Sequence, residues 1–301
     1  MDLLTRSDFD GLACAVIFRE IGLIDNWRFV HPKDLQDGTV KVTSNDILAN
    51  VPYVHGCGMW FDHHASEGER GSAPANFVGS FKTLDSAARV VYEYYKDQYD
   101  LSKFESMLDE VDRIDAGRLT AEDISDPKGW VLLGFVSDPR TGLGRFHDFS
   151  ISNYALMQEL VDHCRNLSID EILRLPDIEE RIQLYKEQAL LFTKMLKDHT
   201  VINGNIIVTD LRGVSPIYAS NRFMPYSIFP EQNISMWIVD GKNRETCSIA
   251  VGYSILNRTA TVDVGSILLS YGGGGHKQVG TCQIISSDAD RVIAELQEKL
   301  Q

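Results

Sequence analysis

The chain has 301 residues, of which 44% are hydrophobic and 24% charged, and 29 Lys and Arg against 43 Asp and Glu give a net charge of −14. This composition excludes intrinsic disorder and fibrous classes, and the length suffices for two domains that each have a core. Because so acidic a surface repels a long polyanion, we expect no long DNA or RNA as a partner.

Neither a membrane span nor an export signal is expected. No apolar run approaches the roughly 18 residues that a span needs, and the first residues show no basic segment followed by an apolar one. Five cysteines are scattered along the chain without a Cys-x-x-Cys pair, which argues against a disulfide framework and against a thiolate zinc site. We therefore predict a cytoplasmic protein without a membrane partner.

The first 65 residues predict a parallel sheet flanked by helices. Short apolar runs typical of strands alternate with a helix over residues 12–21, and these runs are residues 3–5, 27–30 and 59–61. From about residue 84 the apolar spacing becomes helical. The helical segments are residues 87–92, 104–111, 154–164 and 177–197, the last entered at Pro176.

The last hundred residues change in character. Asn203-Gly204-Asn205 predicts a hairpin turn, and strands are expected at residues 206–208, 236–239 and 248–251. The acidic surplus also ends near residue 200. We predict an α/β fold with two domains joined by the long helix: an N-terminal parallel-sheet domain, residues 1–199, and a smaller C-terminal α/β domain, residues 200–301.

Carboxylates gather where the first predicted strand ends. Asp8 and Asp10 lie between that strand and the first helix, at the sheet edge where open parallel sheets bind ligands. Taken alone, Asp8 is equally well explained as a helix N-cap.

Two further segments carry the same chemistry. Asp46 follows the apolar residues 40–42, and Asp62-His63-His64 follows the predicted strand at 59–61. Three strand ends would thus deliver acidic residues to one edge. Crowded carboxylates with imidazole are suitable ligands for a divalent cation such as Mn²⁺, which neutralises their repulsion.

A glycine run near the C-terminus is the second specific signal. Gly272, Gly273, Gly274 and Gly275 are followed by His276. Without Cβ atoms, the backbone N–H groups can approach an anion closely. This predicts a substrate-binding segment, to which Arg222 would add a cation. The arginine-bearing segment at residues 140–145 could form a cationic loop over the cleft, but a solvated connector is the preferred interpretation.

These motifs, in this order and spacing, resemble the DHH phosphoesterase family with its associated C-terminal domain. The resemblance covers nearly the whole chain. It implies a Mn²⁺ centre of one or two ions, with Mg²⁺ as the alternative, on the first domain, and a second domain that binds substrate.

The resemblance also implies residue roles. Asp8 would bind the first metal, Asp10 and His63 the second, and Asp46 both. Asp115, in an Asp-Ala-Gly turn, would be the last ligand, with Asp112 as the competing assignment.

The remaining motif residues would support the reaction, since Asp62 would orient His63 and His64 would lie near the scissile phosphate. Two positions depart from the family pattern. Arg6 replaces the usual histidine ligand of the first metal, and residues 250–254 lack the strand arginine of nucleotide-cleaving relatives. If the first ion is replaced by Arg6, its guanidinium would hold a phosphate oxygen.

The expected activity is metal-dependent hydrolysis of phosphoester bonds in a small nucleotide or short oligonucleotide. Two alternatives stay open: an exopolyphosphatase-like hydrolase, and a nucleotide- or metal-binding protein that has lost turnover. The expected partner is therefore a small phosphorylated substrate, and a homodimer is compatible with the sequence.

Overall fold

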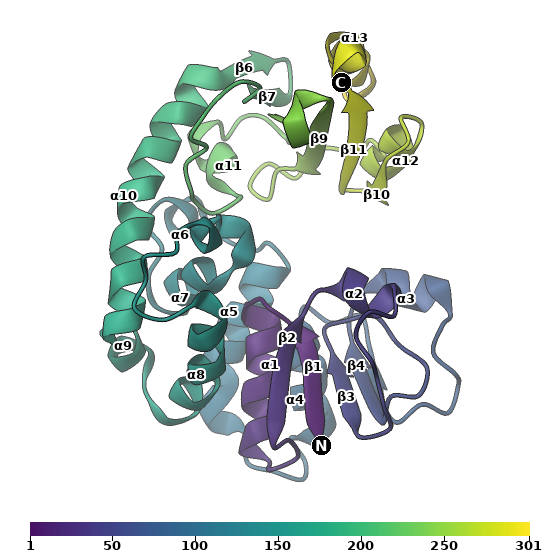
Figure 1. Ribbon diagram of the computed structural model, residues 1–301, viewed down its shortest axis with the longest axis vertical. Coiled ribbons are helices and arrows are strands. Elements are labelled where there is room, and N and C mark those ends of the chain that lie inside the picture. Colours follow the sequence, from purple (N-terminus) through teal and green to yellow (C-terminus); the bar gives the residue numbers. More distant parts are fainter. The chain divides into compact units, whose positions relative to one another are not determined.

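A computed structural model describes the backbone of residues 1–301 and the side chains of residues 1–68 and 71–301. The chain forms two compact units (Figure 1). The first comprises Met1–Arg118 and Pro127–Gln183, and the second comprises Leu119–Asp126 and Leu184–Gln301. Helix α10 (Pro176–His199) therefore contains the division. The functional boundary predicted at residues 199 and 200, at the end of this helix, stays a prediction.

The first unit is built on a five-stranded sheet with the order β2-β1-β3-β4-β5, in which every neighbouring pair is parallel. Its strands are β1 (Asp2–Arg6), β2 (Asn26–Val30), β3 (Asp46–Ala49), β4 (Met59–Asp62) and β5 (Gly79–Phe81). Because all strands run the same way, their carboxyl ends meet at one edge of the sheet. The α/β prediction for this part of the chain is confirmed.

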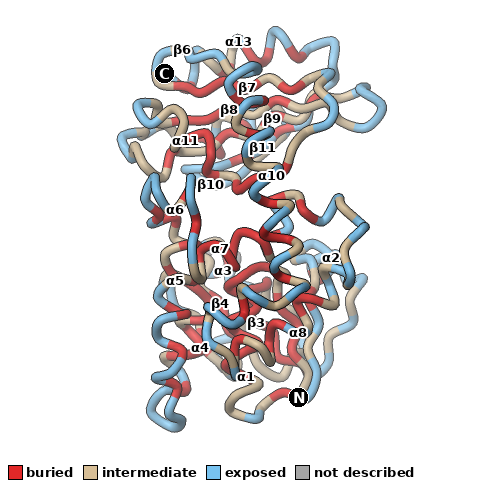
Figure 2. Tube along the Cα trace, turned by 90° about the vertical axis from the view of Figure 1, so that its left-hand side faces the viewer, coloured by how far each residue is buried: buried red, intermediate tan, exposed pale blue. Residues whose placement is uncertain are grey.

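Helices surround this sheet. They are α1 (Phe9–Glu20), α2 (Pro32–Gln36), α3 (Ala65–Arg70), α4 (Ala87–Tyr95), η1 (Ser102–Phe104), α5 (Glu105–Asp115), α7 (Gly129–Ser137), η2 (Pro139–Thr141), η3 (Leu143–Arg145), α8 (Asn153–Asn166) and α9 (Ile169–Ile172). Helix α1 is buried from Phe9 to Phe18 because it contacts β1, α4, α5 and α8. The buried segments of the chain stand out in Figure 2. A helix that is apolar all round is expected in such a position.

The second unit has a six-stranded sheet with the order β10-β11-β9-β8-β7-β6, antiparallel except between β7 and β8. Its strands are β6 (Thr200–Asn203), β7 (Ile206–Asp210), β8 (Ile234–Asp240), β9 (Thr246–Tyr253), β10 (Gly274–His276) and β11 (Val279–Ile285). The other elements are α6 (Ala121–Ser125), α11 (Met224–Ile228), η4 (Lys242–Arg244), α12 (Val264–Leu269), η5 (Ser286–Asp288) and α13 (Ala289–Lys299). The predicted hairpin at residues 203–205 connects β6 and β7.

The core of the second unit lies on one face of its sheet. Met236, Ile238, Ile249 and Val251 point into it and meet the apolar faces of α12 and α13. The alternate residues of these strands lie on the opposite face. None of the helices in the described chain has both the length and the apolar character needed to cross a bilayer.

Candidate metal centre

Three side chains, of which Asp10 is buried and His63 and Asp115 are partly exposed, converge at the carboxyl edge of the parallel sheet. Asp10 lies in the first turn of α1, His63 follows β4, and Asp115 ends α5. His63 Nε2 is 3.7 Å from Asp10 Oδ2 and 3.4 Å from Asp115 Oδ2. One oxygen or nitrogen from each residue lies within 4.8 Å of the others. The structure thus brings together three of the residues predicted from sequence.

The backbone fixes the Asp10 carboxylate in place. Its two oxygens accept hydrogen bonds from the N–H groups of Ala87 and Ala88, at 2.9 and 2.7 Å, at the start of α4. A carboxylate at a helix N-terminus is stabilised by the helix dipole. Asp10 is therefore oriented by two elements that are 77 residues apart in the sequence.

The contacts of His63 orient its ring. Nδ1 lies 3.0 Å from the carbonyl oxygen of Leu84, so the Nδ1–H group donates to this carbonyl and Nε2 is the ring nitrogen that can bind a metal ion. This Nε2 is buried and has no hydrogen-bond partner among the described side chains. Its neighbours are the carboxylates of Asp10 and Asp115, which would attract a metal ion to the point that Nε2 faces.

The three side chains fit a divalent cation. Two carboxylates and a neutral imidazole suit Mn²⁺ or Mg²⁺, for which neighbouring ligand atoms are about 3 Å apart. The hydrogen bond from Nδ1 to a carbonyl is the usual way of orienting a ligating histidine. We therefore assign Asp10, His63 and Asp115 to a candidate metal centre.

The charges of this centre repel one another in the protein without a cation. Burial raises the pKa of the Asp10 carboxyl to about 7; His63 opposes this, whereas the charges of Asp115 and Asp8 add to it. Burial also raises the pKa of Asp115, with the charge of Asp8 next. A bound divalent cation would favour the ionised forms of both carboxyls.

Asp8 lies beside this centre, but its carboxylate is occupied by protein groups. Oδ1 accepts hydrogen bonds from the Gly11 N–H at 3.1 Å and from Asn50 Nδ2 at 3.0 Å. Oδ2 is 3.1 Å from Arg6 Nε and 3.8 Å from Arg140. Asp8 is thus both the N-cap of α1, as one interpretation expected, and the partner of two guanidinium groups. Cationic side chains lie where a first metal ion was expected.

Asp46 is not brought to the centre, and that prediction is wrong. β3 begins at Asp46, which pairs with Asp2 at the opposite edge of the sheet. Its Oδ2 accepts hydrogen bonds from the backbone N–H and the hydroxyl of Thr43. The apolar residues 40–42, which suggested a strand, lie in a loop.

Asn50 takes the strand-end position that Asp46 was expected to fill. It follows β3 directly and has a φ of 56°, a left-handed conformation that Asn tolerates. Its amide supplies a donor to Asp8 and no negative charge. Sequence reasoning missed this residue, although a strand over residues 47–49 would have indicated it.

Arg140 belongs to the segment for which a solvated connector was preferred over a cationic loop. Its segment is not a solvated connector, because Arg140 forms a bidentate ion pair with Asp138 and also approaches Asp8. Burial opposes the charged form, but the hydrogen bond and charge of Asp138 raise the pKa of this guanidinium. No local pattern marks it, since its partner Asp8 lies 132 positions earlier in the sequence.

Asp112, the competing candidate for the last metal ligand, is bonded to protein groups. Its oxygens accept hydrogen bonds from Ser86 Oγ at 2.6 Å and Arg89 Nε at 2.7 Å. These contacts tie α5 to the start of α4. Asp115, one turn later, faces His63 instead.

Asp62 and His64 form a pair next to the centre. His64 Nδ1 is 2.7 Å from Asp62 Oδ1, which also accepts the His63 N–H at 2.8 Å. Burial alone would lower the pKa of His64, but the hydrogen bond and charge of Asp62, with Asp115 and Asp10, raise it to about 9. Asp62 therefore orients both histidines, through the backbone of one and the ring of the other.

A pocket of about 240 Å³ opens beside Asp8 in the first unit. Its lining includes Arg6, Arg140 and His31. Both arginine side chains are about one-third exposed, so each can reach a ligand while it pairs with an aspartate. Two guanidinium groups in one pocket are suited to phosphate oxygens.

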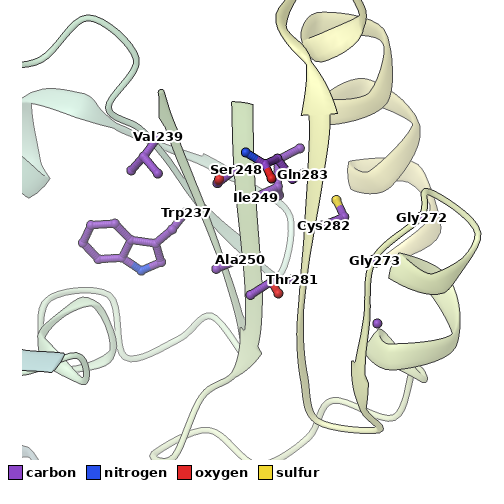
Figure 3. Close-up of a pocket in the computed structure, with 11 residues that line it drawn as sticks. Trp237, Val239, Ser248, Ile249, Ala250, Gly272, Gly273, Thr281, Cys282 and Gln283 are labelled. Atoms are coloured by element: carbon purple, nitrogen blue, oxygen red, sulfur yellow. The ribbon is translucent and has the colours of Figure 1, made fainter. Parts of the chain in front are cut away.

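The glycine run of the second unit differs from the anion site expected from sequence. The N–H groups of Gly272 and Gly273 donate to the carbonyls of Leu269 and Leu268, so they are not free for an anion. Figure 3 shows Gly272 and Gly273 beside the strand that carries Thr281, where both line a pocket of about 600 Å³. A Cβ on Gly273 would collide with the carbonyl oxygen of Thr281. Close packing against β11 thus accounts for this glycine.

The other predicted substrate-binding residues of this unit are Gly274, Gly275, His276 and Arg222, and they do not form one site. A Cβ on Gly275 would collide with Val279, whereas one on Gly274 would meet nothing within 4 Å. His276 is exposed at the end of β10. Arg222 lies over the ring of Phe223 and lines neither of the two pockets described here.

No protein-family model matches the chain, and the search of curated proteins found no significant match. The search of solved structures did find similar proteins. A pGpG-specific phosphodiesterase, PggH, from Vibrio cholerae is 42% identical, with a TM-score of 0.87 over 99% of this chain and 98% of that one. An exopolyphosphatase-related protein from Bacteroides fragilis is 11% identical, with a TM-score of 0.51 over 99% and 91%, a likeness of fold alone. The identity to PggH spans nearly the whole of both chains, and the chain therefore belongs to the DHH phosphoesterase family.

Proposed function

We propose that this protein is a metal-dependent phosphodiesterase that hydrolyses the phosphoester bond of a small guanine dinucleotide such as pGpG. The observation that carries the proposal is the cluster of Asp10, His63 and Asp115, in which His63 Nε2 is buried and has no hydrogen-bond partner among the described side chains. The likeness to a pGpG-specific enzyme over nearly the full length of the chain supports the substrate class.

Different residues of the chain would bind the metal ion and supply positive charge. Asp10, His63 and Asp115 hold one divalent cation, Mn²⁺ or Mg²⁺. When bound, such an ion lowers the pKa of a coordinated water and neutralises charge on the phosphoryl oxygens. Arg6 and Arg140 supply the positive charge on the other side, where Asp8 is already paired.

These arginines would bind the scissile phosphate. Their guanidinium groups line the 240 Å³ pocket beside the centre and present N–H donors to two phosphoryl oxygens. Asp8 and Asp138 hold the two guanidinium planes, so little side-chain entropy is lost when substrate binds.

His64 would move the proton that the leaving ribose oxygen requires. Its Nδ1 is bound to Asp62, which leaves Nε2 as the atom that exchanges a proton with substrate. Asp62 stabilises the charged form of the ring, as a carboxylate does in other histidine pairs.

The test is an assay of the purified protein with pGpG, with Mn²⁺ and with Mg²⁺, in which the mononucleotide product is separated by chromatography. His63→Ala is expected to lose metal binding and turnover. His55→Ala, at an exposed histidine of the same unit, is the matched control and is expected to keep both.

A substrate panel separates the alternatives. Short polyphosphate cleaved in preference to pGpG would support the exopolyphosphatase-like alternative. Metal bound at one equivalent without turnover of pGpG, di- to pentanucleotides, cyclic dinucleotides or polyphosphate would overturn the proposal and favour a binding protein.

A further inference from the structure

Residues 84–88, at the entry to α4, contact the candidate metal centre without supplying a ligand to it. The Leu84 carbonyl accepts from His63 Nδ1 at 3.0 Å. Two N–H groups in the first turn of α4 donate to the two oxygens of Asp10, at 2.9 and 2.7 Å. One short backbone stretch therefore orients two of the three candidate ligands.

The third candidate ligand is connected to the same segment through α5. Ser86 Oγ donates to Asp112 Oδ1 at 2.6 Å, and Arg118 Nη2 is 2.7 Å from Asp85 Oδ2. Asp112 lies one turn before Asp115, and Arg118 lies three residues after it. The chain that carries Asp115 is thus bonded to residues 84–88 on both sides of this ligand.

The two connections differ in strength. The Asp85 and Arg118 side chains are 43% and 49% exposed, and an ion pair so open to water contributes little. Ser86 is fully buried, with an exposed fraction of 0%. A hydrogen bond from a buried hydroxyl to a carboxylate is short and strong, so Ser86 provides the firmer connection.

The Ser86 hydroxyl also sets where α4 begins. It accepts from the Arg89 N–H at 3.0 Å while it donates to Asp112, so it is bonded both as donor and as acceptor. Ser86 is the N-cap of α4 and has extended backbone angles, φ −151° and ψ 158°. An N-cap fixes the direction of the N–H groups that follow it. Here those are the groups that bind Asp10.

The packing of α4 on α5 does not depend on this hydroxyl alone. Arg89 Nε donates to Asp112 Oδ2 at 2.7 Å and joins the same two helices. Removal of the Ser86 hydroxyl should therefore leave α4 and α5 in contact and act on the path of residues 84–88. The expected result is displaced metal ligands in a folded protein.

We propose that Ser86 is a positioning residue of the candidate metal centre. Its hydrogen bonds to α5 and within the first turn of α4 hold residues 84–88 so that the three candidate ligands lie together before an ion binds. Ser86 itself touches neither the metal ion nor the substrate. The inference rests on the proposed function for the presence of a divalent cation, and not for the choice of substrate.

Calorimetric titration of the full-length protein with Mn²⁺ tests this role without turnover. Ser86→Ala is expected to weaken Mn²⁺ binding by about tenfold, since groups that orient metal ligands change affinity by about 10- to 100-fold. Ser86→Thr keeps a hydroxyl that can cap the helix and donate to Asp112. It is expected to bind Mn²⁺ within about twofold of wild type.

Ser152→Ala is the matched control. Ser152 caps α8 by accepting from the Ala155 N–H at 3.1 Å, and within the described chain it has no hydrogen bond to a candidate ligand. This variant loses the same kind of cap and should keep the wild-type affinity for Mn²⁺.

Ser86→Gly guards against a folding defect. Glycine is nearly as good an N-cap as serine, so the Tm should stay close to that of wild type, but the hydroxyl is gone. Its affinity for Mn²⁺ should fall as in Ser86→Ala. Circular dichroism and the Tm establish that each variant is folded.

The inference and the proposed function fail differently. If pGpG is hydrolysed while Ser86→Ala and Ser86→Gly bind Mn²⁺ as wild type does, Ser86 is a helix cap only, and the phosphodiesterase stands. An equal loss of affinity in Ser152→Ala also overturns the inference, because general loosening would explain it. If the Ser86 variants alone bind Mn²⁺ weakly but metal-loaded wild type turns over nothing in the substrate panel, the positioning role stands and the proposed chemistry falls.

Discussion

Asn50 Nδ2 donates a 3.0 Å hydrogen bond to Asp8 Oδ1, while Arg6 lies 3.1 Å from the other oxygen of the same carboxylate. Because an amide and a guanidinium already bind its two oxygens, this carboxylate is a poor ligand for a metal ion. The two sides of the site therefore differ in charge. The negative charge of Asp8 is neutralised by arginines, whereas no Lys or Arg among the described side chains pairs with Asp10.

We expect the wild-type protein to bind one Mn²⁺ per chain, because the carboxylates of the Asp10, His63 and Asp115 cluster form no ion pair with a Lys or Arg among the described side chains, whereas Asp8 pairs with Arg6 and Arg140. The double variant Arg6→His with Asn50→Asp should bind two, since it replaces a cation and an amide by ligands. Elemental analysis after dialysis measures the ratio. Asp46→Asn is the control and should leave it at one; two ions in wild type would refute this account of Asp8.

Arg140→Ala should lower kcat/KM for pGpG by about 10- to 100-fold, because a charge-assisted contact to a phosphate is lost, a cost of about 1.4 to 2.7 kcal/mol. Arg145→Ala, in the same loop, removes an arginine that donates to the Gly142 carbonyl and should have little effect. Steady-state kinetics at saturating metal measures both. Equal losses in the two variants would mean that Arg140 acts through the loop and not on substrate.

Asp115→Asn and Asp112→Asn should separate metal binding from folding. The first removes a charge that faces His63 and should weaken Mn²⁺ binding at least about tenfold with little change in Tm. The second breaks contacts to Ser86 and Arg89 and should cost about 1 to 3 kcal/mol of stability. Metal titration and urea unfolding of each variant give the two readouts, and a reversed pattern would make Asp112 the ligand.

Gly273→Ala should destabilise the second unit, whereas Gly274→Ala should be tolerated. A Cβ at Gly273 would overlap the Thr281 carbonyl and reach 2.7 Å from the Cys282 Cα, whereas at Gly274 the space is open. Forcing β10 from β11 is a form of overpacking, with a cost of about 1 to 3 kcal/mol. Thermal unfolding compares the variants, and equal stability of both would show that packing does not require Gly273.

Glu20 should contribute stability that acid removes. Burial alone would raise its pKa, but hydrogen bonds from Lys103 at 2.6 Å and Arg165 at 3.1 Å lower it below the usual 4.5. The folded state then binds fewer protons than the unfolded state, so the contribution is present above pH 4.5 and is lost as pH falls through the depressed pKa.

Glu20→Gln should therefore cost about 0.5 kcal/mol near pH 7, a modest value because the pair is partly exposed. The difference from wild type should shrink below pH 4.5 in urea unfolding curves. Glu298→Gln, at an exposed position on α13, serves as the control and should show no such trend. A difference that is constant from pH 7 to pH 3.5 would rule out the ion pairs as its origin.

Much of the fold follows from local patterns. The strands at β1, β2 and β4, the helix after Asp8 and the hairpin at residues 203–205 are where apolar spacing and turn residues predict them. The same holds for Asp10 and His63, because Asp10 lies in the first turn of the helix that follows β1, His63 directly follows β4, and the carboxyl ends of parallel strands must meet.

The residues that form β3 could not be predicted from the sequence in the same way. β3 has four residues, all buried, and it pairs on both sides, so a short apolar run at residues 40–42 competed with residues 47–49 for the strand. The difference moves a carboxylate from one edge of the sheet to the other. Only the paired neighbours of β3 settle which run forms it.

The sequence by itself determined the two α/β parts, their order of elements and the acidic and histidine residues at two strand ends, because these depend on neighbours within a few positions. Tertiary structure alone decided that Asn50 replaces Asp46, that Arg140 pairs near Asp8, and that the N–H groups of Gly272 and Gly273 are already bonded. Each of these depends on atoms brought together by strand pairing or packing, and the free energy of such contacts has no signature in the local sequence.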